Sequence, residues 1–100
     1  MLIPDSFQLG AHTIEVRKGV PLKEAWGEWN NETKIIRLRT PSKRNPESFY
    51  NQTFIHELVH AVLDAMGRDA LSKDEGFVDA LSEYLAQALT TSIGGFGKDK

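Results

Sequence analysis

The sequence predicts a single α+β domain in which a small β-sheet of about three strands, antiparallel or mixed, packs on two helices. The first 40 residues contain short stretches in which polar and apolar residues alternate, which is the period of a half-buried strand. Two longer stretches follow, residues 46–66 and 72–91, in which apolar residues recur every three or four positions, as in a helix.

Length and composition narrow the class further. One hundred residues form one domain, which we expect to span residues 1–93, and we expect the Gly-rich, charged residues 94–100 to fray. A hydrophobic content of 40% and a net charge of -2 are ordinary for a soluble globular chain and give no basis for general nucleic-acid binding. With no basic segment followed by an apolar run at the start, and no long apolar stretch, we expect a cytoplasmic protein with no membrane partner.

Two regions of the first 40 residues have the strand pattern. Residues 7–16 alternate around a central glycine, with Ile14 and Val16 on one side, and predict one or two short strands. Residues 25–29 and 34–39 flank an Asn-Asn pair, which favours a turn, and predict a β-hairpin.

The first helix is expected to have Asn45 as its N-cap and Pro46 at its first position, and to end at Gly67. Its apolar residues fall on two flanks, which indicates a helix packed between two layers. These flanks are Phe54, Leu58, Ala61 and Ala65, and Ile55, Val59, Val62 and Met66. The remaining stripe, which should open onto a cleft, contains Phe49, Thr53, His56 and His60.

The second helix is expected to start at Ser72 and to run to about Thr91. Ser72 and Glu75 have the spacing of a capping box, in which Glu75 at the third helical position reaches back to the backbone of Ser72. The predicted core face consists of Phe77, Val78, Leu81, Leu85 and Leu89.

The segment from His56 to His60 reads His-Glu-x-x-His within the first helix. Residues four apart share a helical face, so both imidazoles can reach one metal ion while Glu57 reaches a water molecule on that ion. Because the chain has no cysteine, the metal must be held by nitrogen and oxygen, and the pattern predicts zinc. The alternative interpretation is a pair of solvated histidines on a charged helix face.

A catalytic zinc ion needs three protein ligands and one open position. Glu75 is the candidate for the third ligand, although the capping box offers another explanation of it. Asp79 lies one turn later on the same face and can accept a hydrogen bond from a ligand imidazole, or be an ordinary solvated residue. His12 is better explained as an ordinary strand or turn residue than as a ligand or substrate-binding group.

In these residues the sequence resembles the gluzincin branch of zinc metallopeptidases, in which His-Glu-x-x-His on one helix is completed by Glu on the next, often as Asn-Glu-x-x-x-Asp. An Asp stands here in place of that Asn. The resemblance implies one zinc ion held by His56, His60 and Glu75. It also implies Glu57 as general base and acid, and Asp79 as the partner of His56. A small sheet followed by two such helices is similar to the small phage and prophage relatives of ImmA/IrrE peptidases, which implies a minimal zincin-like fold.

These features predict zinc-dependent peptide-bond hydrolysis by a small intracellular endopeptidase related to phage or prophage proteins. Its substrate would be a protein or peptide, such as a regulatory or phage structural protein. The alternative is a zinc-binding, zincin-fold interaction module without catalytic activity, because no donor for the oxyanion is evident and both Tyr50 and Tyr84 lie off the ligand face. Retention of Glu57 favours the enzyme. A nucleic-acid-binding regulator is disfavoured by a pI of about 5.9.

The predicted hairpin is the candidate substrate-binding element, since in zincins the strand at the cleft binds an extended peptide as an additional strand. Trp26 and Trp29 could line this cleft, although a core position is more common for Trp in so small a domain. A local basic cluster is best explained by a solvated sheet face, with contact to an acidic partner second. It comprises Lys34, Arg37, Arg39, Lys43 and Arg44.

Overall fold

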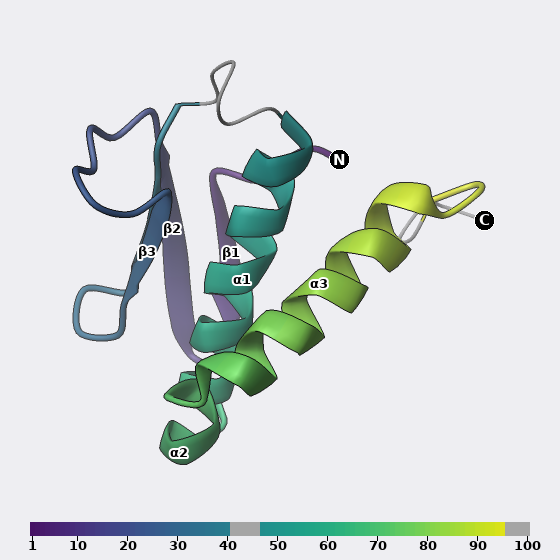
Figure 1. The fold of residues 1–100 in the computed structure, drawn as a ribbon. Coiled ribbons are helices and arrows are strands. Elements are labelled where there is room, and N and C mark those ends of the chain that lie inside the picture. The colour runs from purple at the N-terminus through teal and green to yellow at the C-terminus, as the bar shows by residue number, and fades with distance from the viewer. Residues whose placement is uncertain (41–46, 96–100) are drawn as a thin grey trace.

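A computed structural model of the chain describes residues 1–40 and 47–95. In this part of the chain four strands form one sheet and three helices follow, so the α+β class is confirmed (Figure 1). The elements are β1 (Ser6–Leu9), β2 (His12–Lys18), β3 (Gly27–Asn30), β4 (Ile35–Leu38), α1 (Glu47–Ala65), α2 (Asp69–Ser72) and α3 (Glu75–Thr91).

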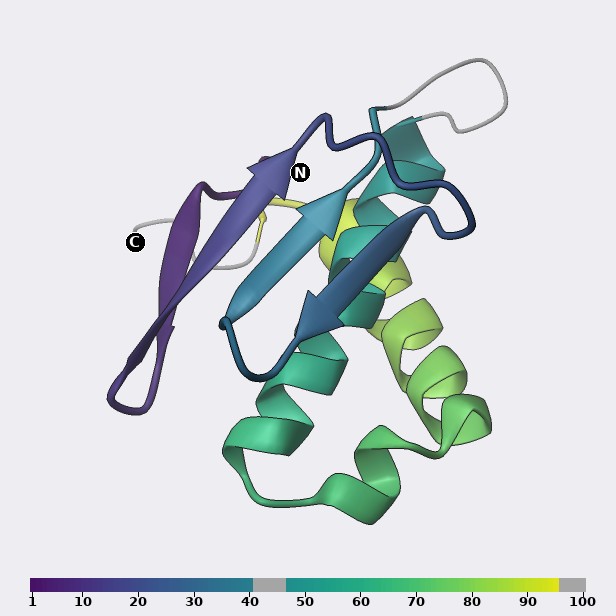
Figure 2. The same ribbon diagram turned by 90° about the vertical axis from the view of Figure 1, so that its left-hand side faces the viewer.

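The sheet has four strands rather than about three, in the order β1-β2-β4-β3. Residues 7–16 contribute to two strands because Gly10, with φ of 59°, adopts the left-handed conformation of a tight turn. β1 pairs antiparallel with β2, and β3 pairs antiparallel with β4 as the predicted hairpin, whereas β2 and β4 are parallel. β3 is therefore an edge strand, and Figure 2 shows it at one side of the sheet with α1 behind it.

Helix α1 lies between the sheet and α3, which confirms the prediction of a helix packed between two layers (Figure 1). The alternation in β2 and β4 buries one face of the sheet, and α1 and α3 contribute the rest of the core. The buried apolar side chains include Ile14, Val16, Ile36, Leu38, Phe54, Ile55, Val59, Leu63 and Val78. Ala65 and Met66, predicted on the buried flanks, are exposed because the last turn of α1 extends beyond the sheet (Figure 2).

The end of α1 is as predicted, since Gly67 has a left-handed φ of 73°. The expected cap and first residue, Asn45 and Pro46, lie outside the described residues, as do Lys43, Arg44 and residues 96–100 of the expected tail. None of the helices in the described ranges combines the length and the apolar character that crossing a membrane requires.

The second predicted helix differs in its start, because it is divided into α2 and α3. Ser72 is the last residue of α2 rather than an N-cap. The N-cap of α3 is Asp74, whose Oδ1 accepts a hydrogen bond from the Phe77 main-chain N–H at 3.1 Å. Asp is as good an N-cap as Ser, so it starts the helix two residues later, and the capping box, the alternative explanation of Glu75, is wrong.

The buried face of α3 also differs from the prediction. Val78 is buried as predicted and Leu89 packs half-buried against the core, but Phe77, Leu81 and Leu85 are each more than one third exposed. The other buried residues of α3 are Ser82 and Ala86. The small side chains of Ser82 and Ala86 allow α3 to lie close against α1, and this close packing outweighs the burial of the larger leucines.

Candidate metal centre

Helix α1 places His56 and His60 one turn apart, and Glu75 is the first residue of α3. Ring nitrogens of the two imidazoles and a carboxylate oxygen of Glu75 lie within 4.8 Å of one another. The structure thus brings together the three residues expected as ligands, although they come from two helices.

Two distances in this cluster, one from each imidazole to an oxygen of the Glu75 carboxylate, are close to the ligand spacing around a tetrahedral zinc ion. His56 Nε2 lies 3.5 Å from Glu75 Oε1, and His60 Nε2 lies 3.5 Å from Glu75 Oε2. Metal–ligand bonds of about 2.0–2.1 Å at tetrahedral angles separate two ligand atoms by about 3.4 Å. Two imidazole nitrogens and one carboxylate are also a donor set that catalytic zinc sites use. The residues present therefore fit the ion in both spacing and chemistry.

A carboxylate lies beside the Nδ1 atom of one imidazole ring, and a hydroxyl forms a hydrogen bond with that of the other. His56 Nδ1 lies 3.2 Å from Asp79 Oδ1, and His60 Nδ1 lies 3.1 Å from the Ser72 hydroxyl oxygen. Partners at Nδ1 leave both Nε2 atoms directed at Glu75, which is the arrangement that a histidine metal ligand requires. Asp79 thus occupies the position expected for it.

The contact between Ser72 and His60 was missed by sequence reasoning. Ser72 is buried, with 7% of its surface exposed, at the end of α2. A Ser before an acidic pair predicts a helix cap, and that signal was misleading here. Helix α2 has four residues, too few for an apolar period to reveal it.

The histidines are not the solvated pair of the alternative interpretation. The side chains of His56 and His60 are only 24% and 14% exposed, and their ring centroids are 5.0 Å apart. The side chains of Glu75 and Asp79 are 64% and 62% exposed. The cluster is therefore buried on its α1 side and open to solvent on its α3 side.

Glu57 is buried beside the cluster, with 8% of its surface exposed. Its pKa is raised to about 7, chiefly because burial disfavours the charged form and further because Glu75 and Glu28 are negatively charged neighbours. Glu28 on β3 is a neighbour that the sequence did not reveal, and it forms an ion pair with Arg37 at 2.5 Å. A divalent cation held by the cluster would oppose these effects and favour the carboxylate.

Two cavities meet at the cluster. One has a volume of about 270 Å³ and is lined by Trp26, Gly27, Phe49, Gln52, Thr53, His56, Glu57 and Asp79. The other has a volume of about 500 Å³ and is lined by Asn31, His60, Asp64, Asp69, Ser72, Lys73 and Glu75. Both border the cluster, with His56 in the lining of the first and His60 and Glu75 in that of the second, and we refer to the two together as the cleft.

The two tryptophans occupy different environments. Trp26 lines the first cavity, where its ring meets Phe49 edge to face at a centroid distance of 5.9 Å and the Arg39 guanidinium lies 4.2 Å from its centroid. Trp29 packs against the core, and its indole N–H donates a hydrogen bond to Asp64 at 2.7 Å. Trp26 therefore lies in the cleft, whereas Trp29 belongs to the core.

The other candidate residues lie away from the cluster. His12 is exposed at the start of β2 and borders a small separate cavity with Trp29 and Lys34, which agrees with an ordinary strand histidine. Tyr84 is 73% exposed, and Tyr50 packs against the core, where burial raises its pKa. Neither tyrosine lines the two cavities at the cluster.

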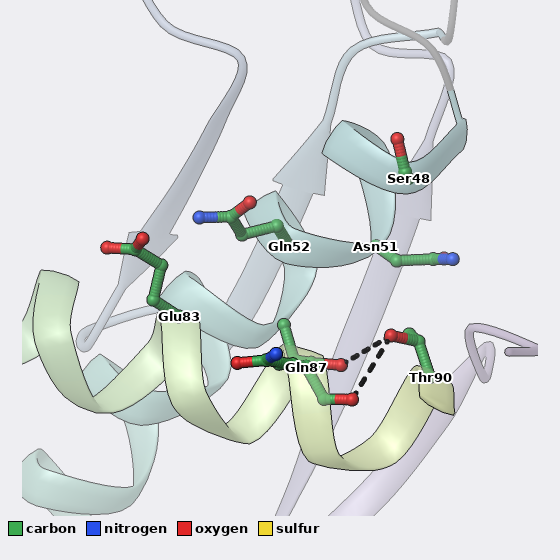
Figure 3. A pocket seen from close by; sticks show the side chains of 7 residues that line it. Ser48, Asn51, Gln52, Glu83, Gln87 and Thr90 are labelled. Carbon is green, nitrogen blue, oxygen red and sulfur yellow. Dashed lines mark hydrogen bonds between the residues drawn. The ribbon is translucent and has the colours of Figure 1, made fainter. Parts of the chain in front are cut away.

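A third cavity, of about 360 Å³, lies between the N-terminal half of α1 and the C-terminal half of α3 (Figure 3). Its lining is mainly amide and hydroxyl groups, with one carboxylate, and it contains no histidine. The lining residues are Ser48, Asn51, Gln52, Glu83, Ala86, Gln87 and Thr90. Gln52 also lines the first cavity, so this cavity continues the cleft.

A function for this chain has to be assigned from the geometry of the site, because comparison with known proteins identifies no relative. No protein-family model, no curated protein and no solved structure matches the chain.

Proposed function

We propose that the chain is a zinc-dependent peptidase of the gluzincin type, with a minimal zincin-like fold. The observation that carries this proposal is the convergence of His56 Nε2, His60 Nε2 and the Glu75 carboxylate, with each nitrogen 3.5 Å from a Glu75 oxygen and Glu57 buried beside them. A purely structural site would gain nothing from an additional, buried carboxylate beside its ligands.

The chain's own residues have separate tasks in the proposed reaction. Zinc, when bound, supplies a Lewis acid that polarises a carbonyl group and lowers the pKa of a water molecule. Glu57 accepts the proton of the attacking water at its carboxylate and delivers that proton to the leaving amine. Asp79 and Ser72 hold the imidazoles of His56 and His60 in orientation at Nδ1.

The edge of β3 can position an extended substrate. The main-chain oxygen of Trp26 accepts a hydrogen bond from the N–H of Arg39, so Trp26 faces β4. Because N–H and C=O groups alternate in direction along an antiparallel strand, those of Gly27 and Trp29 point to the open edge. A peptide added at this edge would pass the cavity that contains His56 and Glu57.

The alternative is a zinc-binding interaction module that hydrolyses nothing by itself. Hydrolysis needs a hydrogen-bond donor that stabilises the oxyanion, and Tyr or Arg would be a strong one. Neither is among the described residues that line the two cavities at the cluster, which favours the module. Side-chain donors in the linings include those of Trp26, Gln52, Asn31 and Lys73. As an enzyme, the protein would act in the cytoplasm, on a regulatory or phage structural protein.

Metal analysis and hydrolysis of unfolded proteins test the proposal. We expect one zinc ion per chain, loss of zinc in His60→Ala, and retention of zinc in the matched control His12→Ala. Glu57→Gln should keep zinc and lose hydrolysis, because an amide cannot accept the proton. Equal hydrolysis by the parent and Glu57→Gln would remove Glu57 from the mechanism, and a zinc-loaded parent that binds a partner without cleaving it would favour the interaction module.

A further inference from the structure

The cavity between α1 and α3 has the chemistry of a peptide-binding groove. Primary amides and hydroxyls both donate and accept hydrogen bonds, as the main chain of a peptide requires. Asn51 is 7% exposed and lines this cavity, and no hydrogen bond links its side chain to a described residue. A buried amide gains stability from each hydrogen bond it makes, so a ligand in the cavity would supply bonds that residues 1–40 and 47–95 do not give to Asn51.

The groove adjoins the cavity that contains His56, because Gln52 lines both. Figure 3 shows Gln52 and Glu83 at one end of the cavity and Asn51 and Thr90 at the other. The Gln52 end adjoins the first cavity, which contains His56. A chain that leaves the reaction site along α3 therefore enters the groove at Gln52 and Glu83.

The groove is acidic near this entrance. Glu75, Asp79 and Glu83 follow one another at intervals of four along α3 and share one face. Among the described residues that line the first and third cavities there is no Lys or Arg. Glu75 and Asp79 already contact the histidines, whereas no ion pair joins Glu83 to another described residue. Glu83 is therefore the acid available to a ligand.

We propose that this groove is a remote substrate-binding site that takes a polar stretch of the substrate and pairs an Arg or Lys side chain with Glu83. The proposal rests on the proposed peptidase function. Glu83 lies eight residues after Glu75, which is about 12 Å along the helix. An extended chain covers about 3.3 Å per residue, so the basic side chain stands three or four residues from the scissile bond.

The test uses the full chain loaded with zinc. Cleavage sites in an unfolded protein are mapped by mass spectrometry, and octapeptides spanning one site are made with Arg, Ala or Glu at each position in turn. Arg at the third or fourth position from the scissile bond should raise kcat/KM about fivefold over Ala, as one partly exposed ion pair would, and less so at high salt.

Variants of Glu83 decide whether this preference comes from the groove. Glu83→Gln should remove it and Glu83→Lys should reverse it in favour of the Glu peptide, whereas the matched control Glu32→Gln, in an exposed turn, should retain it. An Arg preference that persists unchanged in Glu83→Gln would overturn the proposal.

A second measurement does not depend on catalysis. Zinc-loaded Glu57→Gln is titrated with the Arg and Ala octapeptides, and the side-chain amide signals of Asn51, Gln52 and Gln87 are followed by NMR. Larger shifts and tighter binding with the Arg peptide support the groove even if the parent hydrolyses nothing. Unmoved amide signals, or equal affinity for both peptides, would refute it even if the parent is an active peptidase.

Discussion

Ser72→Ala tests whether the α2 hydroxyl positions a metal ligand. The hydroxyl lies 3.1 Å from His60 Nδ1, and both side chains are largely buried, so water cannot readily replace it. Without this partner the His60 ring loses the group that fixes its orientation. Loss of such a partner weakens metal binding by about 10- to 100-fold, which corresponds to about 1.4–2.7 kcal/mol.

Competition with a chromophoric chelator measures the zinc Kd, and urea unfolding in excess chelator measures the stability of the metal-free chain. Ser82→Ala is the matched control. Ser82 is also buried, at 2% exposure, but its hydroxyl donates to the main-chain oxygen of Asp79 at 3.2 Å and contacts no imidazole. We expect both variants to lose about 1 kcal/mol or less of metal-free stability, and Ser72→Ala alone to lose zinc affinity.

A zinc Kd of Ser72→Ala within twofold of the parent would show that the hydroxyl does not orient His60. An equal loss of affinity in Ser82→Ala would show that the effect is a general loosening of the helices. In either case Ser72 would not be a specific positioning group for His60.

Three further predictions follow from the same structure. Zinc at a hundredfold excess over its Kd should stabilise the fold by about 2.7 kcal/mol, seen as a rise in Tm that a chelator reverses, because the site joins α1 to α3. Gly27→Ala should lower the urea-derived free energy of unfolding by about 1–3 kcal/mol, since its Cβ would lie 2.7 Å from Thr53 Cγ2 and 3.0 Å from Leu38 Cδ2. In chelator, the stability of the parent should fall as the pH rises from about 4.5 to about 7, because the folded pKa of Glu57 is raised above its unfolded value. Glu57→Gln should remove this loss, so at pH 8 the metal-free variant should be more stable than the metal-free parent by up to about 3 kcal/mol. If the free energy of unfolding of both proteins changes with pH in the same way, the pKa of Glu57 is not raised.

The parts of the fold that were predictable have a period or a turn signal in the sequence. Alternation placed Ile14 and Val16 on one face, and Gly67 marked the end of α1. The parallel pairing of β2 with β4 could not be predicted, because it depends on how two separate hairpins meet over α1. The same limit applies to Glu28, which comes near Glu57 only through that pairing of the sheet with α1.

Two expectations about α3 were mutually incompatible, and their conflict explains the error in its buried face. At about 100° per residue, the predicted core face is centred near Leu85, about 90° from Glu75 and about 130° from Asp79. Had that face been buried, Glu75 would have lain at the side of the contact with α1 and Asp79 would have pointed away from it. The observed face, centred on Ser82, lies only about 20° from Glu75 and about 60° from Asp79. The rotation of α3 that exposes Phe77, Leu81 and Leu85 is thus the one that brings Glu75 and Asp79 to the histidines. Its cost is the apolar surface that these three side chains leave in water.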